Sequence, residues 1–171
     1  MLERVVNALS LAADEVVVVR AGGQRLPAAL GGVTVVEDIH VGRGPLGGLH
    51  AGLSTIESGC AIVVGCDMPF LDPGLLAGLA PMAGECDAVV PRVGGRLQTL
   101  HAVYGRTCLG AVATLLERGR PGLHDLLGLV RVRYMEDGDL AETGRWRRSC
   151  MSVNTPADLE RAESLLSLPG T

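Results

Sequence analysis

The stretch 61-AIVVGCDMPFLDP-73 decides the expected fold. Its opening residues are apolar and lack the polar alternation of a strand with one face in water, so they predict a strand buried on both faces. This strand runs directly into the carboxylate of Asp67. Asp72 and Pro73 then predict the N-cap and the first residue of a helix. The stretch therefore carries a single acidic side chain to the end of a buried strand.

Helix and strand patterns alternate along the first half of the chain. The β-branched runs 15-EVVVVR-20 and 33-VTVVED-38 predict two further strands, and apolar residues at helical spacing predict a helix over residues 2–13. A glycine-rich turn, 42-GRGPLGG-48, opens another predicted helix. Strands that alternate with helices indicate an α/β sandwich with a mainly parallel sheet.

The second half of the chain adds an antiparallel portion. The segments 88-AVVPRV-93 and 97-LQTLHAVYG-105 flank a Gly94-Gly95 turn, which predicts a hairpin. Thr155-Pro156 begins the last predicted helix. The chain has 171 residues and shows neither a repeat nor a low-complexity linker, so we expect a single domain over residues 1–171.

Composition excludes several classes of protein. The net charge of −4, without a conspicuous run of basic residues, argues against general nucleic-acid binding. No apolar run reaches the ~18 residues of a membrane helix, which argues against a membrane protein. The five cysteines form no C-x-x-C pair, which is typical of reduced thiols. We therefore expect a cytoplasmic protein.

Polar side chains stand at the ends of predicted strands. Asp38, Asp67 and Asn154 each follow an apolar run, and ligands of parallel α/β sheets bind beyond such strand ends. Mg²⁺ takes one or two protein oxygens together with water and substrate phosphates, so Asp67 can hold it and Asn154 can offer a second oxygen. Alternatively, Asp67 caps the following turn through its own hydrogen bonds. The residues alone leave both interpretations open.

Two further segments are candidates for ligand contacts. The segment 42-GRGPLGGLHAGL-53 can present backbone N–H groups at a helix N-terminus to an anion or a base edge, although it matches neither common glycine-rich phosphate motif. A tight connection between strand and helix explains it equally well. His101 is either a ligand contact or a hydrogen-bonded, partly buried histidine, and Gln98 precedes it by three residues.

Taken together, four stretches resemble the molybdenum cofactor guanylyltransferase family: 42-GRGPLGGLHAGL-53, 64-VGCDMPFL-71, 96-RLQTLHAVY-104 and 153-VNTPADLERAE-163. The resemblance runs essentially from end to end. The pairing of G-P-L-x-G-L with C-D-M-P-F-L is its most specific part. It implies a Rossmann-like nucleotidyltransferase fold, a three-layer sandwich with a mainly parallel sheet and a small antiparallel portion.

The resemblance also implies a reaction, in which GMP passes from GTP to Mg-bound molybdopterin and gives molybdopterin guanine dinucleotide and pyrophosphate. It implies that Asp67 is the catalytic residue and holds Mg²⁺, with Asn154 on the metal side. It assigns nucleotide binding to Asp38, Gly44, Pro45, Leu46 and Gly47, and pterin binding to Gln98 and His101. The partners expected from the resemblance are a molybdenum insertase and molybdoenzyme chaperones.

The chain departs from the family pattern at its start. The family has a first strand and a glycine-rich loop, L-A-G-G-x-S-x-R-M-G, followed by a lysine. This chain begins at the next helix, and all 15 of its basic residues are arginine. We therefore expect an N-terminally truncated domain that lacks the first strand and loop. Unpaired buried backbone groups cost ~1–3 kcal/mol each, so we expect the chain alone to be poorly stable and inactive.

Two other functions stay open at this point. One is a cytidylyl- or sugar-nucleotide transferase of the same fold. The other is a non-catalytic nucleotide- or pterin-binding partner protein that has lost its triphosphate loop. Nucleotide competition tests the transferase alternative, because a guanylyltransferase should bind GTP best. Translation of the DNA upstream of Met1 tests the partner-protein alternative, because a glycine-rich loop there argues against it and an immediate stop codon argues for it.

Overall fold

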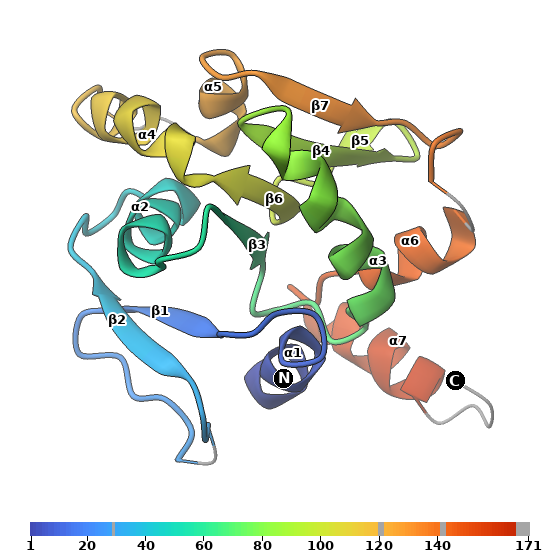
Figure 1. Cartoon of the computed structure of the whole chain (residues 1–171). Coiled ribbons are helices and arrows are strands. Elements are labelled where there is room, and N and C mark those ends of the chain that lie inside the picture. The colour runs from blue at the N-terminus through green and yellow to red at the C-terminus, as the bar shows by residue number, and fades with distance from the viewer. Residues whose placement is uncertain (29, 120–121, 141–142, 167–171) are drawn as a thin grey trace.

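The computed structural model describes residues 1–28, 30–119, 122–140 and 143–166, and Figure 1 shows their arrangement. Its strands are β1 (Val17–Ala21), β2 (Thr34–Asp38), β3 (Cys60–Val64), β4 (Ala88–Val93), β5 (Arg96–Leu97), β6 (His101–Gly105) and β7 (Val132–Met135). Its α-helices are α1 (Leu2–Leu9), α2 (Pro45–Thr55), α3 (Pro73–Leu79), α4 (Leu109–Leu116), α5 (Leu123–Leu127), α6 (Thr143–Ser149) and α7 (Pro156–Leu166). Short 3₁₀ turns are η1 (Ala80–Gly84) and η2 (Arg106–Cys108).

The strands form two sheets. β1 and β2 pair in parallel, whereas the larger sheet has the order β3-β6-β4-β5 with β7 beside β4. β3, β4 and β7 run the same way, but β6 lies antiparallel between β3 and β4. The expected mainly parallel sheet is therefore only partly correct. The reason is that β6 follows β4 through a short hairpin, which has no room for the crossover that a parallel pair requires.

The hairpin expected around Gly94-Gly95 is confirmed. Both glycines have positive φ, 56° and 77°, as a tight hairpin turn requires. β5 returns beside β4, with Arg92 opposite Leu97. The returning strand is then interrupted, because the His101 amide donates to the Gln98 carbonyl at 3.0 Å. Gln98 consequently lies in a turn, while His101 begins β6 inside the sheet.

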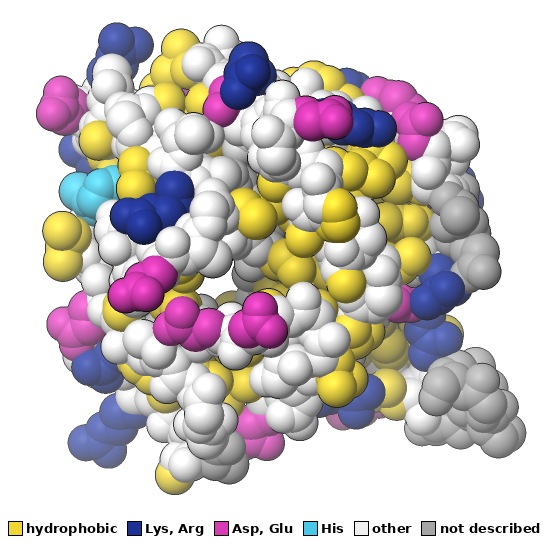
Figure 2. Space-filling model, viewed as in Figure 1, with side chains coloured by type: hydrophobic (Ala, Val, Ile, Leu, Met, Phe, Trp, Pro, Cys, Tyr) yellow, Lys and Arg dark blue, Asp and Glu magenta, His cyan; other side chains and the backbone are white. Residues whose placement is uncertain are grey.

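Helices α1 and α2 connect the two sheets through apolar packing. The buried face of α2 contacts Val17 of β1 and also Ala61 and Val63 of β3. On α1, Val6 packs against β1 and Val5 packs against the β3 side. Figure 2 shows an opening between the β1 and β3 regions, with acidic side chains on its lower rim.

No strand pairing joins β1 to β3 in the part of the chain that the structure describes. β1 pairs with β2 there, and β3 pairs with β6. The family resemblance predicted that a first strand and its loop are absent, and this stays a prediction. The single domain over residues 1–171 also stays a prediction. No described helix has the length and apolar character needed to cross a membrane.

Backbone amides of β1 and β2 are expected to exchange hydrogen for deuterium faster than those of β4 and β6. A two-stranded sheet is only marginally stable by itself, whereas Val89 and Val103 of the larger sheet are completely buried. Hydrogen exchange followed by mass spectrometry on peptides from both sheets measures the difference. Equal protection of the two sheets would show that they open as one cooperative unit and would contradict this expectation.

Candidate active site

Asp67 lies just beyond the carboxyl end of β3, and its side chain folds back over Gly65. A Cβ atom placed on Gly65 would lie 2.4 Å from Asp67 Oδ1, so a larger residue there would displace the carboxylate. The side chain of Asp67 is partly exposed. Among the described residues, it forms neither a hydrogen bond nor an ion pair. The carboxylate is therefore free to bind a ligand.

The capping interpretation of Asp67 does not agree with these contacts. The residue that caps the following helix is Asp72, whose Oδ1 accepts hydrogen bonds from the amides of Gly74 at 3.0 Å and Leu75 at 3.2 Å. The expected Asp72-Pro73 helix start is thereby confirmed. Arg145 also pairs with the Asp72 carboxylate. Two acids in one loop therefore differ in role, since Asp72 is held by the fold and Asp67 is not.

Asn154 is held close to this loop. The amide of the preceding residue, Val153, donates to the Asp67 carbonyl oxygen at 2.9 Å. Asn154 is exposed, and its side-chain amide donates to Ser152 Oγ at 2.9 Å. The backbone amides of Asn154 and Thr155 both donate to the Asp158 carboxylate, which caps α7. The side-chain carbonyl oxygen of Asn154 is therefore presented on a backbone that the start of α7 fixes.

The oxygens at this end of β3 fit a particular kind of metal. The described residues contain no group of three His, Cys, Asp or Glu side chains that could hold an ion by themselves. Mg²⁺ does not need one, because it binds one or two protein oxygens and completes its shell with water and substrate phosphates. A free carboxylate and an amide oxygen on adjoining segments are suitable donors for this ion.

Asp38 forms a second cluster with the glycine-rich start of α2. A Cβ atom on Gly47 would lie 2.7 Å from both carboxylate oxygens of Asp38, so the carboxylate lies directly against the first helical turn. The positive end of the helix dipole stabilises a carboxylate there. Gly44 caps the helix with φ 57°, a conformation suited to glycine. Leu46 is completely buried, backbone included, and Gly47 is buried, so Gly44 and Pro45 are the exposed part of this segment.

Two histidines that the sequence did not assign to a site adjoin Asp38. The amide of His40 donates to Asp38 Oδ1 at 2.7 Å, and His40 Nε2 lies 3.3 Å from His50 Nδ1. Burial and the neighbouring His40 lower the pKa of His50, while Asp38 opposes the shift. The signal available in the sequence was the Asp-x-His spacing immediately after a strand.

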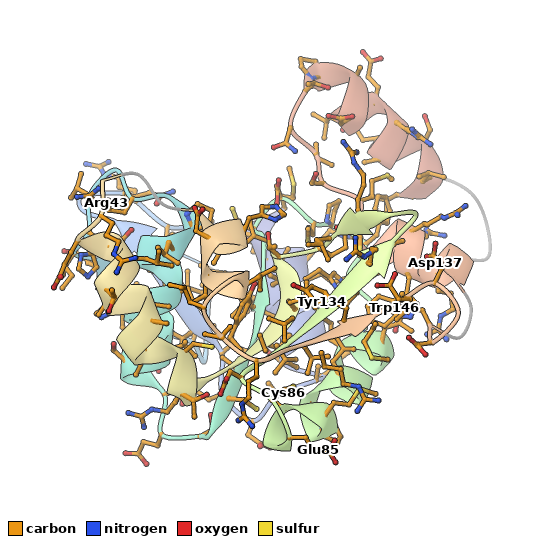
Figure 3. The ribbon with its side chains drawn as sticks, turned by 90° about the horizontal axis from the view of Figure 1, so that it is seen from above. Arg43, Glu85, Cys86, Tyr134, Asp137 and Trp146 are labelled. Carbon is orange, nitrogen blue, oxygen red and sulfur yellow. The ribbon has the colours of Figure 1, made fainter. Side chains whose placement is uncertain are left out.

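His101 is not placed as the resemblance implied, because it is completely buried. Its Nε2 lies 2.7 Å from Ser149 Oγ, and that hydroxyl accepts the Asp72 amide at 2.9 Å. Trp146, which is labelled on α6 in Figure 3, packs in the core beside the sheet. Its ring meets the His101 ring edge to face. His101 therefore ties α6 and the loop after Asp67 to the sheet and does not reach a ligand surface.

Gln98, the other expected pterin contact, is separated from His101 by the turn. Its side chain is partly exposed and donates to the Arg96 carbonyl at 3.1 Å. No hydrogen bond or ion pair joins the Asp38 cluster, the Asp67 cluster and Gln98 within the described ranges. The structure thus joins the segment of Asn154 to the Asp67 loop and places Asp38 against the start of α2, without a direct hydrogen bond between the two groups among the described residues.

Comparison with known proteins places the chain in a family. Residues 1–134 match the model of the MobA-like NTP transferase domain. The chain belongs to this family. A probable molybdenum cofactor guanylyltransferase of Natronomonas pharaonis is 40% identical over 98% of this chain and 85% of its own length. A protein of the same name from Pelotomaculum thermopropionicum is 36% identical over 95% of this chain and 78% of its own length.

Solved structures of the MobA-like and related transferases have the same fold. Molybdopterin-guanine dinucleotide biosynthesis protein A of Archaeoglobus fulgidus matches with a TM-score of 0.70 and 28% identity over 79% of this chain and 69% of that one. A 2-C-methyl-D-erythritol 4-phosphate cytidylyltransferase of Thermus thermophilus matches with a TM-score of 0.72 at 20% identity, over 98% and 89% of the two chains. The expected α/β nucleotidyltransferase fold is therefore confirmed, and the second similarity concerns the fold alone.

The pair Gly47→Ala and Gly48→Ala tests the Asp38 cluster of this MobA-like domain. Both changes add helix propensity worth up to about 1 kcal/mol. Only Gly47→Ala drives a Cβ into the Asp38 carboxylate, because a Cβ on Gly48 has open space around it. We expect urea unfolding to show Gly48→Ala as more stable than the parent and Gly47→Ala as no more stable or less stable. Equal gains would contradict the contact.

Stability is expected to fall at acid pH because His101 is buried. Burial lowers the pKa of His101 from 6.5 to about 4. Below pH 6.5 His101 therefore binds a proton in the unfolded chain but stays neutral in the folded chain. The free energy of unfolding falls by at most about 1.4 kcal/mol per pH unit until the pH reaches the pKa of His101 in the folded chain. Urea unfolding at pH 7 and pH 5 measures this loss. The loss of stability between pH 7 and pH 5 should be smaller in His101→Gln than in the parent protein. In His124→Gln, which alters an exposed histidine, the loss should equal that of the parent. Equal losses in the two variants would contradict this expectation.

Proposed function

We propose that the chain is a molybdenum cofactor guanylyltransferase, which transfers GMP from GTP to Mg-bound molybdopterin and releases pyrophosphate. The observation that carries the proposal is the free carboxylate of Asp67 at the end of β3. A carboxylate without a protein partner is a suitable ligand for the Mg²⁺ that this reaction uses. Relatives at 36% and 40% identity over nearly the whole chain also carry the name of this enzyme.

Asp67 and Asn154 would hold Mg²⁺ in this proposal. The ion, when bound, neutralises charge on the α-phosphate that is attacked. The protein contributes position: the Val153–Asp67 hydrogen bond keeps the two oxygen-bearing residues on adjoining segments. Phosphoryl transfer depends mostly on such positioning and on charge stabilisation, so the reaction does not require a nucleophilic side chain.

Asp38 and the backbone of Gly44–Gly47 would bind the nucleoside end of GTP. A carboxylate repels phosphate but accepts hydrogen bonds from N–H and O–H groups. Guanine offers an N1–H and an amino group on one edge, and ribose offers hydroxyls. The contact between Asp38 and the first turn of α2 therefore favours the base or sugar over the triphosphate at this place.

The acceptor side of the site is the finer part of the proposal. Gln98 is partly exposed and is the residue proposed to contact the pterin, whereas His101 supports the adjoining loop from within. Action in the cytoplasm and delivery of the product through a molybdenum insertase or a molybdoenzyme chaperone complete the proposal.

Nucleotide competition separates this function from that of the structurally similar cytidylyltransferase. Binding of GTP and CTP in the presence of Mg²⁺ is compared by calorimetry on the product of the complete reading frame. The guanylyltransferase proposal expects GTP to bind at least about 10-fold more tightly, which corresponds to the net contribution of about one hydrogen bond. Preference for CTP would overturn it.

Asp67→Asn is expected to lower GMP transfer by about 10²–10³-fold, since it removes a charged group that stabilises the reacting phosphate. Pyrophosphate release from GTP with molybdopterin and Mg²⁺ measures the rate in the product of the complete reading frame. Asp72→Asn is the matched control, because asparagine also caps a helix and Asp72 is already held by the fold. Unchanged transfer in Asp67→Asn would show that this carboxylate is not the metal ligand.

A further inference from the structure

A groove lined with arginine lies beside helices α6 and α7, and its lining contains none of the residues assigned to substrate or metal. One hollow, of about 410 Å³, has Arg147, Arg148 and Arg161 around it and Met151 and Leu165 in its lining. Figure 3 shows α7 standing away from the sheet. Basic side chains gather near α6 and α7 at the right of Figure 2. The hollow therefore combines a cationic rim with an apolar floor.

A second hollow, of about 390 Å³, adjoins the first, because Arg148 lines both. Its lining includes Arg4 from α1 and Phe70 from the loop after Asp67. The Arg148 guanidinium lies 5.1 Å from the Phe70 ring centre, which fixes its direction through a cation–π contact. The groove consequently extends from α7 to the N-terminal helix.

Charge along this groove is only partly balanced by the protein itself, because Asp72 lines the second hollow and Asp158 interacts with Arg161. Within the described ranges, Arg147 and Arg148 form no ion pair with a carboxylate. Arg145 is different, since it pairs with Asp72. The whole chain carries a net charge of −4, so this concentration of arginine is opposite in sign to the molecule as a whole. An acidic ligand complements it.

The apolar part of the groove indicates the kind of acidic ligand. Only Ala162 is buried among the described α7 side chains, and Leu159 and Leu166 are 45% and 38% exposed. Inorganic phosphate offers nothing to Met151 and Leu165, whereas a peptide can supply carboxylates and apolar side chains together. Arginine binds carboxylates in a two-pronged geometry and is enriched at protein interfaces.

We propose that this groove binds an acidic, amphipathic segment of a partner protein. Carboxylates of that segment pair with Arg147, Arg148 and Arg161, and its apolar side chains cover Met151 and Leu165. The contact lies outside the proposed transfer site, so it governs which protein docks and does not take part in chemistry.

Fluorescence anisotropy with a short labelled peptide of Glu and Leu at helical spacing tests the proposal. We expect saturable binding that weakens at least 10-fold in Arg147→Glu combined with Arg161→Glu, two exposed positions. The matched control Arg118→Glu alters an exposed arginine beyond α4 and should leave binding unchanged. A peptide with Gln in place of Glu should not bind. Circular dichroism verifies that the variants are folded, and Arg147→Gln alone repeats the test if the double variant is not.

Three outcomes would overturn the proposal: equal binding of the Gln and Glu peptides, equal loss in Arg118→Glu, or no peptide binding at all. Vesicles containing phosphatidylglycerol are measured in parallel. One outcome would assign the groove to a membrane: the vesicles bind the parent protein, the double variant does not bind them, and the peptide does not bind. In that case the peptide assignment is wrong. GMP transfer is not the readout, so this test and the test of the proposed function fail independently.

Discussion

The hydrogen bond from the Val153 amide to the Asp67 carbonyl is the interaction on which the candidate site depends. It joins the loop after β3 to the segment before α7, two parts of the chain that are distant in sequence. The Asp158 cap fixes the second segment, and pairing of β3 with β6 fixes the first. β3 is half-buried along its length, not buried on both faces as its apolar sequence predicted. In the proposed site Asp67 and Asn154 would share Mg²⁺, and both backbones are fixed before any ligand arrives.

The same steric device places both candidate carboxylates. Asp67 folds over Gly65 and Asp38 lies against Gly47, and in each case a Cβ atom would occupy the position of the acid. The two glycines therefore leave the space that the acidic side chains occupy, in addition to any flexibility that they give the backbone. Asp38 ends a strand of one sheet and Asp67 follows a strand of the other, and α1 and α2 connect these sheets by apolar packing. The relation between metal-side and nucleoside-side residues thus rests on that packing.

Local features were predictable from the sequence because their causes are local. The Asp72-Pro73 helix start, the Gly94-Gly95 hairpin and the strand that delivers Asp67 all follow from neighbouring residues. The burial of His101 did not, because it depends on Ser149 from a distant helix. The arginine groove was also missed, since Arg148 of α6 meets Arg161 in one hollow and Arg4 in the other only in the folded chain.

Paramagnetic broadening by Mn²⁺ with GTP, followed in amide NMR spectra, tests the central claim most directly. Mn²⁺ substitutes for Mg²⁺ and broadens the signals of nearby amides. The account predicts that signals of residues 66–68 and 153–155 broaden first, and that those of the buried β4 strand stay sharp. Broadening centred elsewhere, with these two segments unaffected, would show that the carboxylate at the end of β3 does not hold the metal.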